Sequence, residues 1–232
     1  MTRLNLHVER ADGDTTATEV VVRHLLLAGY TGRDRNAVLE HVQELEALGV
    51  TPPERIPTVF VVDPGLVGAL DRVEATGPET SGEAEVVLIQ AGADLLVGVG
   101  SDHTDRAHEA IDVNESKAKC PKPVAPVVWR HRDVEGHWDL LELRSWTTDA
   151  SGRRLYQEGT LAEFLPVDVL LDELGEAGFA DLDGTVAFGG TLSTLGGVAY
   201  GHRFEFELRD PVLDRSISWS YAVDVLDSMS DG

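Results

Sequence analysis

Apolar and polar residues alternate along most of this chain in short runs, the pattern of β-strands that bury one face. Turn residues, mainly glycine, proline and aspartate, separate the runs. The predicted strands are Leu4–Val8, Thr18–His24, Thr58–Val62, Gly82–Gln90, Asp94–Val99, Trp138–Thr147, Arg154–Glu158, Val186–Phe188, His202–Leu208 and Ser216–Val223.

Helical spacing is confined to a few segments. The longest predicted helix, Asp34–Leu48, has an apolar stripe and ends before Gly49. The other predicted helical segments are Pro64–Arg72, Arg106–Ile111 and Leu165–Leu174. Many short strands with few helices predict an α+β fold built on mixed or antiparallel sheets.

Composition restricts the class of protein. The chain has 232 residues, 42% of them hydrophobic, which is enough for one folded domain over residues 1–232. No apolar stretch has the length of a membrane span and no signal peptide is visible, so we expect a cytoplasmic protein. One cysteine excludes an internal disulfide. The net charge of −22 argues against nucleic acid and anionic membranes as partners, and its even spread is typical of proteins soluble in high salt.

Lysine is almost absent, yet Lys117, Lys119 and Lys122 lie within six residues. Arginine does not replace a compact, titratable amine, so a lysine kept in such a sequence indicates a specific need for an ammonium group. We assign that need to Lys117. Lys119 and Lys122 flank Cys120 and Pro121, where a role in a solvated loop is expected.

Glu83 and Glu85 are candidate metal ligands. Residues i and i+2 of a strand point to the same face, so the two carboxylates repel each other unless a cation lies between them. Mg²⁺, Mn²⁺ or Ca²⁺ prefers such oxygen ligands. The alternative is that both side chains face water where the strand begins.

A polar segment follows the next predicted strand. The glycines of Gly98–Gly100 predict a sharp turn that delivers Asp102 as a third ligand, with His103 or Asp105 as alternatives. Arg106 is placed to hold a substrate carboxylate. The structural alternative is a polar turn in which Asp102 caps a helix.

Two further patterns carry possible chemistry. His41 and Glu44 are neighbours on the predicted helix, and a glutamate beside a histidine makes the imidazole a better base for activating water. The alternative is a solvated helix face. Gly189, Gly190 and Thr191 offer backbone N–H groups and a hydroxyl to a carboxylate, or else form a hairpin turn.

Taken in order, these pieces resemble the motifs of the fumarylacetoacetate hydrolase superfamily. The resemblance spans roughly residues 25–223 and includes the features of a divergent, uncharacterised branch, G-S-D-H-T-D-R and S-K-x-x-C-P-K-P. The matching segments are Gly29–Glu44, Glu83–Glu85, Ser101–Arg106, Ser116–Lys117, Gly152–Thr160 and Gly189–Thr191.

The resemblance implies a mixed β-sandwich roll, usually dimeric, with residues 1–55 forming N-terminal strands and a lid helix and residues 56–232 a β-rich core. It implies Mg²⁺ or Mn²⁺ held by Glu83, Glu85 and Asp102. It assigns the remaining roles to His41, Glu44 and Lys117 in catalysis, and to Arg106, Thr191 and Gln157 in binding a small carboxylate substrate.

The activity expected from this resemblance is a divalent-metal-dependent hydrolase or lyase. Its substrate would be a keto acid or β-dicarbonyl, cleaved at a C–C bond through a metal-bound enolate. Hydratase, isomerase or decarboxylase chemistry on the same site is the alternative. A non-catalytic acidic binding protein that keeps the fold is the competing hypothesis, and it predicts that the three acidic side chains point apart.

Overall fold

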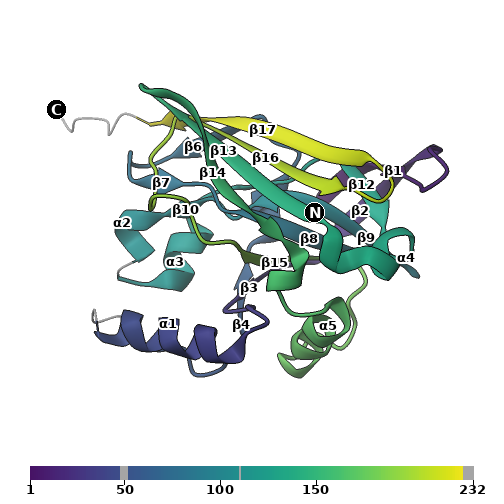
Figure 1. Cartoon of the computed structure of the whole chain (residues 1–232), viewed down its shortest axis with the longest axis horizontal. Coiled ribbons are helices and arrows are strands. Elements are labelled where there is room, and N and C mark those ends of the chain that lie inside the picture. The colour runs from purple at the N-terminus through teal and green to yellow at the C-terminus, as the bar shows by residue number, and fades with distance from the viewer. Residues whose placement is uncertain (48–51, 110, 227–232) are drawn as a thin grey trace.

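Two β-sheets form the body of the protein in the computed structural model, which describes residues 1–47, 52–109 and 111–226 (Figure 1). The larger sheet has eight strands in the order β2-β1-β12-β9-β8-β15-β3-β4. Neighbours pair antiparallel except β1 with β12 and β3 with β15. These strands are β1 (Thr2–Glu9), β2 (Thr15–Val22), β3 (His24–Gly29), β4 (Thr58–Val62), β8 (Ala84–Ala91), β9 (Asp94–Ser101), β12 (Val127–Arg130) and β15 (Thr185–Thr191).

The second sheet has five strands in the order β14-β13-β16-β17-β6 and lies across the larger one (Figure 1). Its strands are β6 (Arg72–Ala75), β13 (Glu142–Asp149), β14 (Gly152–Thr160), β16 (Arg203–Asp210) and β17 (Arg215–Val225). Two short pairs lie outside both sheets. Antiparallel β7 (Thr80–Ser81) and β10 (Thr104–Asp105) form one, and parallel β5 (Val67–Gly68) and β11 (Lys122–Pro123) form the other.

The helices are short and peripheral (Figure 1). They are α1 (Arg35–Ala47), α2 (Arg106–Glu109), α3 (Val113–Ala118), α4 (His131–Val134) and α5 (Val167–Glu176). Among the described residues, no helix combines the length and the apolar character that crossing a membrane requires.

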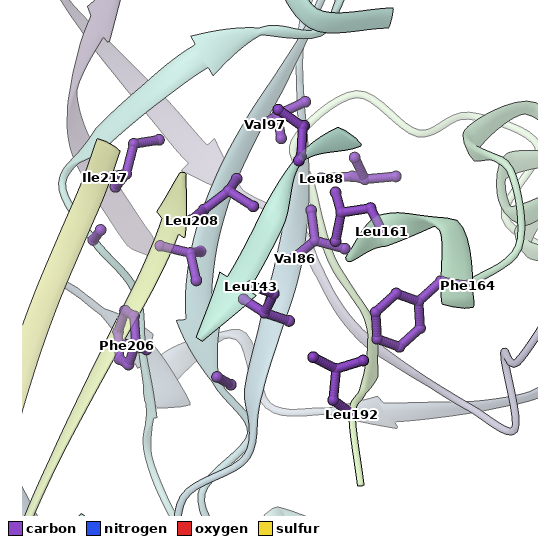
Figure 2. Packing of buried hydrophobic residues seen from close by; sticks show 14 of the residues in the cluster. Val86, Leu88, Val97, Leu143, Leu161, Phe164, Leu192, Phe206, Leu208 and Ile217 are labelled. Atoms are coloured by element: carbon purple, nitrogen blue, oxygen red, sulfur yellow. The ribbon is translucent and has the colours of Figure 1, made fainter. Parts of the chain in front are cut away.

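Strand β8 shows how the sequence builds two cores. Val86 and Leu88 face the five-stranded sheet and pack in the cluster that holds Leu143 and Leu208 (Figure 2). The alternate residues, such as Val87, belong to a second cluster on the opposite face of the same strand. A strand buried on both faces carries a nearly continuous apolar run, as this one does.

The predicted α+β class is confirmed, but some predicted elements are wrong. The predicted helix Pro64–Arg72 is a single 3₁₀ turn, Pro64–Leu66, followed by strands, because Val67 and Val73 turn into the core. The predicted strand Thr18–His24 is divided between β2 and β3. The polar segment around Trp138 is a 3₁₀ turn, and β13 begins only at Glu142.

The N-terminal strands belong to the main sheet. β1 pairs with β12, and β3 pairs with β15, so residues before position 30 complete the sheet that carries β8 and β9. β12 was not predicted from the sequence because its four residues are too few to show a period. The predicted end of the first helix at Leu48 and Gly49 lies outside the described residues.

Candidate metal centre

The β8–β9 hairpin brings three carboxylates together. Glu83 precedes β8, Glu85 lies within it, and Asp102 directly follows β9. The first residues of one strand and the last of its antiparallel partner share one edge, and the Asp102 N–H donates to the Glu83 carbonyl at 2.9 Å. One carboxylate oxygen from each of the three lies within 4.8 Å of the others. Within the described part of the chain, neither His103 nor Asp105 joins this group.

The prediction that the glycines of β9 form a sharp turn is wrong. Gly98 and Gly100 lie inside the strand rather than in a sharp turn. A side chain at Gly100 would meet the Pro123 carbonyl at 2.8 Å and the Phe188 ring at 2.9 Å. Glycine is therefore needed for close packing, which lets the segment after Lys122 cross directly beside the acidic residues.

The environment of these carboxylates fits a hard divalent cation. Asp102 is fully buried and Glu85 is 3% exposed. Burial, together with the neighbouring Asp102 carboxylate, raises the pKa of Glu85 well above its usual value, although Lys117 and the Gly190 N–H oppose this. The Gly190 N–H donates to Glu85 Oε2 at 2.8 Å. A buried carboxylate that resists ionisation beside two others is one that an oxygen-seeking cation would stabilise.

Lys117 lies against this group of carboxylates. It is on α3, which Asp112 caps by accepting from the Glu115 N–H. Its Nζ donates to Asp102 Oδ2, lies 3.6 Å from a Glu83 oxygen, and lies 5.7 Å from the Phe60 ring centroid. Burial opposes ionisation of Asp102, but Lys117 and Lys122 outweigh it and lower the pKa of Asp102 to about 2. The same carboxylates raise the Lys117 pKa against the effect of its own burial, so this ammonium stays charged.

Lys122 corrects the prediction of a solvated loop. Its side chain is 0% exposed, and its Nζ lies 2.9 Å from Asp102 Oδ1 as a close ion pair. The same Nζ donates to the His103 carbonyl at 2.7 Å. The scarcity of lysine is a usable signal for this position, whereas the neighbouring Cys120 and Pro121 favour a loop. Lys119 is exposed as expected, with its Nζ 2.6 Å from His108 Nε2.

Arg106 extends the charge network. Arg106 directly follows β10, which pairs with β7, and its N–H donates to the Glu79 carbonyl at 2.8 Å. Its guanidinium lies 2.9 Å from a Glu83 oxygen and donates to Glu109 and Ser81, each at 2.7 Å. Only about a tenth of the side chain is exposed. Its predicted contact with a substrate carboxylate stays a prediction.

Gln157 and Thr191 brace the start of β8. Gln157 Oε1 accepts from the Ala84 N–H and the Ser145 hydroxyl, and its Nε2 donates to Thr191 Oγ1 at 2.6 Å. Thr191 Oγ1 donates in turn to the Ala84 carbonyl at 3.1 Å. Both residues therefore fix the strand that carries Glu85. Their predicted contacts with substrate are not tested by this geometry.

A buried network of hydrogen bonds connects the backbone of Glu83 to Ser101, Tyr221 and His103. The hydroxyls of Ser101 and Tyr221 share a hydrogen bond of 2.9 Å, and the Tyr221 hydroxyl is 2.9 Å from His103 Nδ1. The Glu83 N–H donates to Ser101 Oγ at 3.1 Å. Burial, with Lys122 and Arg106 nearby, lowers the pKa of His103 to about 3, so its imidazole is neutral at ordinary pH. No local pattern around Tyr221, far along the chain, indicates that it belongs to this network.

His41 and Glu44 lie on α1, and their side chains are outside the described residues. The helix itself is close to its predicted bounds. The proposed dyad therefore stays a prediction.

Comparison with solved structures identifies the fold class. A Burkholderia cenocepacia protein provisionally assigned as a fumarylpyruvate hydrolase matches with a TM-score of 0.61 and 18% identity, over 97% of this chain and 96% of that one. The yeast fumarylacetoacetate hydrolase family protein ynq8 gives 0.61 and 12%, over 88% and 94%. A 2-keto-3-deoxyarabinonate dehydratase gives 0.60 and 16%, over 92% and 78%.

The chain thus has the fold of the fumarylacetoacetate hydrolase proteins, as the resemblance of its motifs implied. It belongs to the family of proteins of unknown function DUF2848, whose family model matches residues 28–221. No curated protein matches the sequence.

Proposed function

We propose that this protein is a divalent-metal-dependent enzyme that acts on a keto acid or β-dicarbonyl, with hydrolytic C–C cleavage as the first choice. The observation that carries the proposal is the convergence of Glu83, Glu85 and Asp102 beside the buried ammonium of Lys117. The competing hypothesis of a non-catalytic acidic protein predicted that these side chains would point apart. The similarity of fold to a fumarylpyruvate hydrolase supports the same choice.

In this proposal Glu83, Glu85 and Asp102 hold Mg²⁺ or Mn²⁺. When bound, such an ion would polarise the substrate carbonyl as a Lewis acid. The ammonium of Lys117 donates a hydrogen bond to a substrate oxygen and offsets the negative charge that develops as an enolate forms. Arg106 forms ion pairs with Glu83 and Glu109, so it holds the Glu83 carboxylate in place and adds a second positive charge beside Lys117.

The general base of the proposal is His41, oriented by Glu44. It takes a proton from water, which adds to the carbonyl. The C–C bond of this adduct then breaks, its electron pair leaves with the enolate, and the imidazole returns the proton to the enolate carbon. The segment that carries this dyad is proposed to act as a lid. His103 is the alternative base, but its depressed pKa and its contact with Tyr221 fit a structural role better.

Dehydration is the second candidate reaction, favoured by the fold shared with 2-keto-3-deoxyarabinonate dehydratase. Isomerase and decarboxylase chemistry would use the same carboxylates and the same lysine. The substrate proposed in every case is a small carboxylate. A homodimer is proposed as the assembly, which sedimentation velocity would detect.

The test is a metal titration joined to a substrate screen. Mn²⁺ or Mg²⁺ at millimolar concentration should raise the melting temperature of the metal-free protein, because a ligand that binds only the folded state stabilises it. The double variant Glu83→Gln/Glu85→Gln should lose that rise. Acylpyruvates, oxaloacetate and 2-oxo-enoic acids should then be screened with the loaded protein. If neither metal changes the melting temperature of the wild type at any salt concentration, the assignment of the metal centre is wrong.

A further inference from the structure

The charges at the candidate metal centre are nearly balanced without any bound ion. Four carboxylates, those of Glu83, Glu85, Asp102 and Glu109, face three cationic side chains. The cations are Arg106, Lys117 and Lys122. With all these groups ionised the net charge is −1, and a divalent ion changes it to +1.

Lys122 is the cation that makes this balance unusual. Both oxygens of Asp102 face ammonium groups, Lys117 at Oδ2 and Lys122 at Oδ1. Lys122 has no contact with solvent, and its Nζ has fixed partners in Asp102 and the His103 carbonyl. Such a buried ion is screened much less than a surface charge, so it acts more strongly on the neighbouring ligand.

We propose that Lys122 is a resident counter-cation that weakens binding of a free divalent ion, so that the metal is held firmly only together with an anionic substrate. The ammonium repels an incoming cation and draws charge density from Asp102, a ligand that the cation needs. A substrate carboxylate restores neutrality once the metal is present. The inference rests on the proposed function and gives a physical reason why its substrate is an anion rather than a neutral dicarbonyl.

Lys122→Gln tests the proposal, because glutamine keeps a donor for the His103 carbonyl and loses the charge. Mn²⁺ affinity is measured by titration calorimetry on the full chain at neutral pH and fixed ionic strength. Lys119→Gln is the matched control, since it makes the same change three residues away on an exposed side chain. Lys122→Gln should bind Mn²⁺ about tenfold more tightly than wild type, while the control should stay within about twofold.

The substrate arm uses pyruvate and pyruvamide, which match in size and differ in charge. Pyruvate should tighten Mn²⁺ binding by the wild type, and pyruvamide should not. The increase in Mn²⁺ affinity caused by pyruvate should be smaller in Lys122→Gln than in the wild type. The proposal would also be supported if Lys122→Gln were unfolded without metal and refolded when Mn²⁺ is added. The ion would then supply the positive charge that the variant has lost.

Three results overturn the proposal. They are equal or weaker Mn²⁺ binding by folded Lys122→Gln, failure of that variant to fold at any Mn²⁺ concentration, and equal enhancement by pyruvate and pyruvamide. Failure of the proposed function looks different: the wild type itself would bind no Mn²⁺, with or without pyruvate.

Discussion

At the residue scale, the three lysines occupy two environments, and the sequence pattern assigned Lys122 to the wrong one. Lys117 and Lys122 are buried on either side of Asp102, whereas Lys119 is exposed. The scarcity of lysine correctly indicated that part of this cluster has a specific environment, since two of the three ammonium groups contact Asp102. Which lysine turns inward depends on how β11 crosses beside β9, and no local pattern records that crossing.

The first prediction at this scale compares Lys117→Arg with Lys119→Arg. Lys117→Arg should lower kcat by about 10²–10³, because a planar guanidinium places its donors differently from a compact ammonium. Its extra volume in a buried position should also cost about 1–3 kcal/mol of stability. Lys119→Arg should change neither quantity. Steady-state kinetics at matched salt and metal, using the substrate found by the screen, gives the comparison, and normal turnover by Lys117→Arg would remove this residue from the mechanism.

Glu85 gives a prediction about pH. Its pKa is raised in the folded state, mainly by burial, so the metal-free folded protein binds a proton that the unfolded chain has already lost. Stability should therefore fall as pH rises from the unfolded value, near 4.5, through the raised folded value. Glu85→Gln carries no such charge, so it should lack this decline and melt higher than wild type in EDTA above that interval.

Thermal unfolding in EDTA across pH measures the effect. Saturating Mn²⁺ should reverse the order of the two proteins, because only the wild type keeps all three ligands. Glu74→Gln, at an exposed position, is the control and should follow the wild-type curve. A wild type whose metal-free stability rose steadily over the same pH range would contradict the assignment.

At the element scale, the β8–β9 hairpin shows what sequence reasoning can reach. The apolar run, the turn at Ala91-Gly92-Ala93 and the alternation of side chains together predicted both strands and the convergence of their acidic residues. The predicted helix Pro64–Arg72 failed because its apolar spacing fits a helix as well as two short strands. Strands as short as β5 and β11 are defined by their partners, so their pairing could not be read from local sequence.

Gly190 connects β15 to the candidate metal centre and gives a prediction for this element. Its φ is +103°, and a Cβ would lie 1.9 Å from Thr31 Oγ1. Gly190→Ala should cost about 2 kcal/mol or more, from backbone strain and the clash together. It should also weaken Mn²⁺ binding, because its N–H holds Glu85.

Gly196→Ala is the matched control, since Gly196 has a φ of +83° and open space around it. That change should cost about 1 kcal/mol of strain and leave Mn²⁺ binding unaltered. Urea unfolding gives both stabilities, and calorimetry gives both affinities. Equal losses in the two variants would show that the contact with Thr31 has no energetic weight.

At the scale of the whole molecule, the ordered set of short motifs predicted the fold better than any single element did. Each motif is weak alone, but their order reflects how strands from both halves of the chain meet at one edge. Residues as distant as Glu85 and Thr191 are direct partners in the sheet. The buried network that reaches Tyr221 was beyond sequence reasoning, since nothing near Tyr221 marks it as polar support for the site.

The net charge of −22 yields a last prediction, on salt. Charge of one sign spread over a compact molecule repels itself, and raising salt from about 0.1 M to 1 M shortens the Debye length from about 10 Å to 3 Å. The same salt weakens surface ion pairs such as Arg3–Glu19, but exposed pairs contribute only about 0–1 kcal/mol each. Repulsion among the excess carboxylates should therefore dominate, and KCl should raise the melting temperature of the metal-free protein at neutral pH.

Near the isoelectric point of about 4.5 this increase in melting temperature should largely disappear, which separates screening from general salt effects on hydrophobic burial. A melting temperature that fell with KCl at neutral pH would show that the ion pairs outweigh the repulsion.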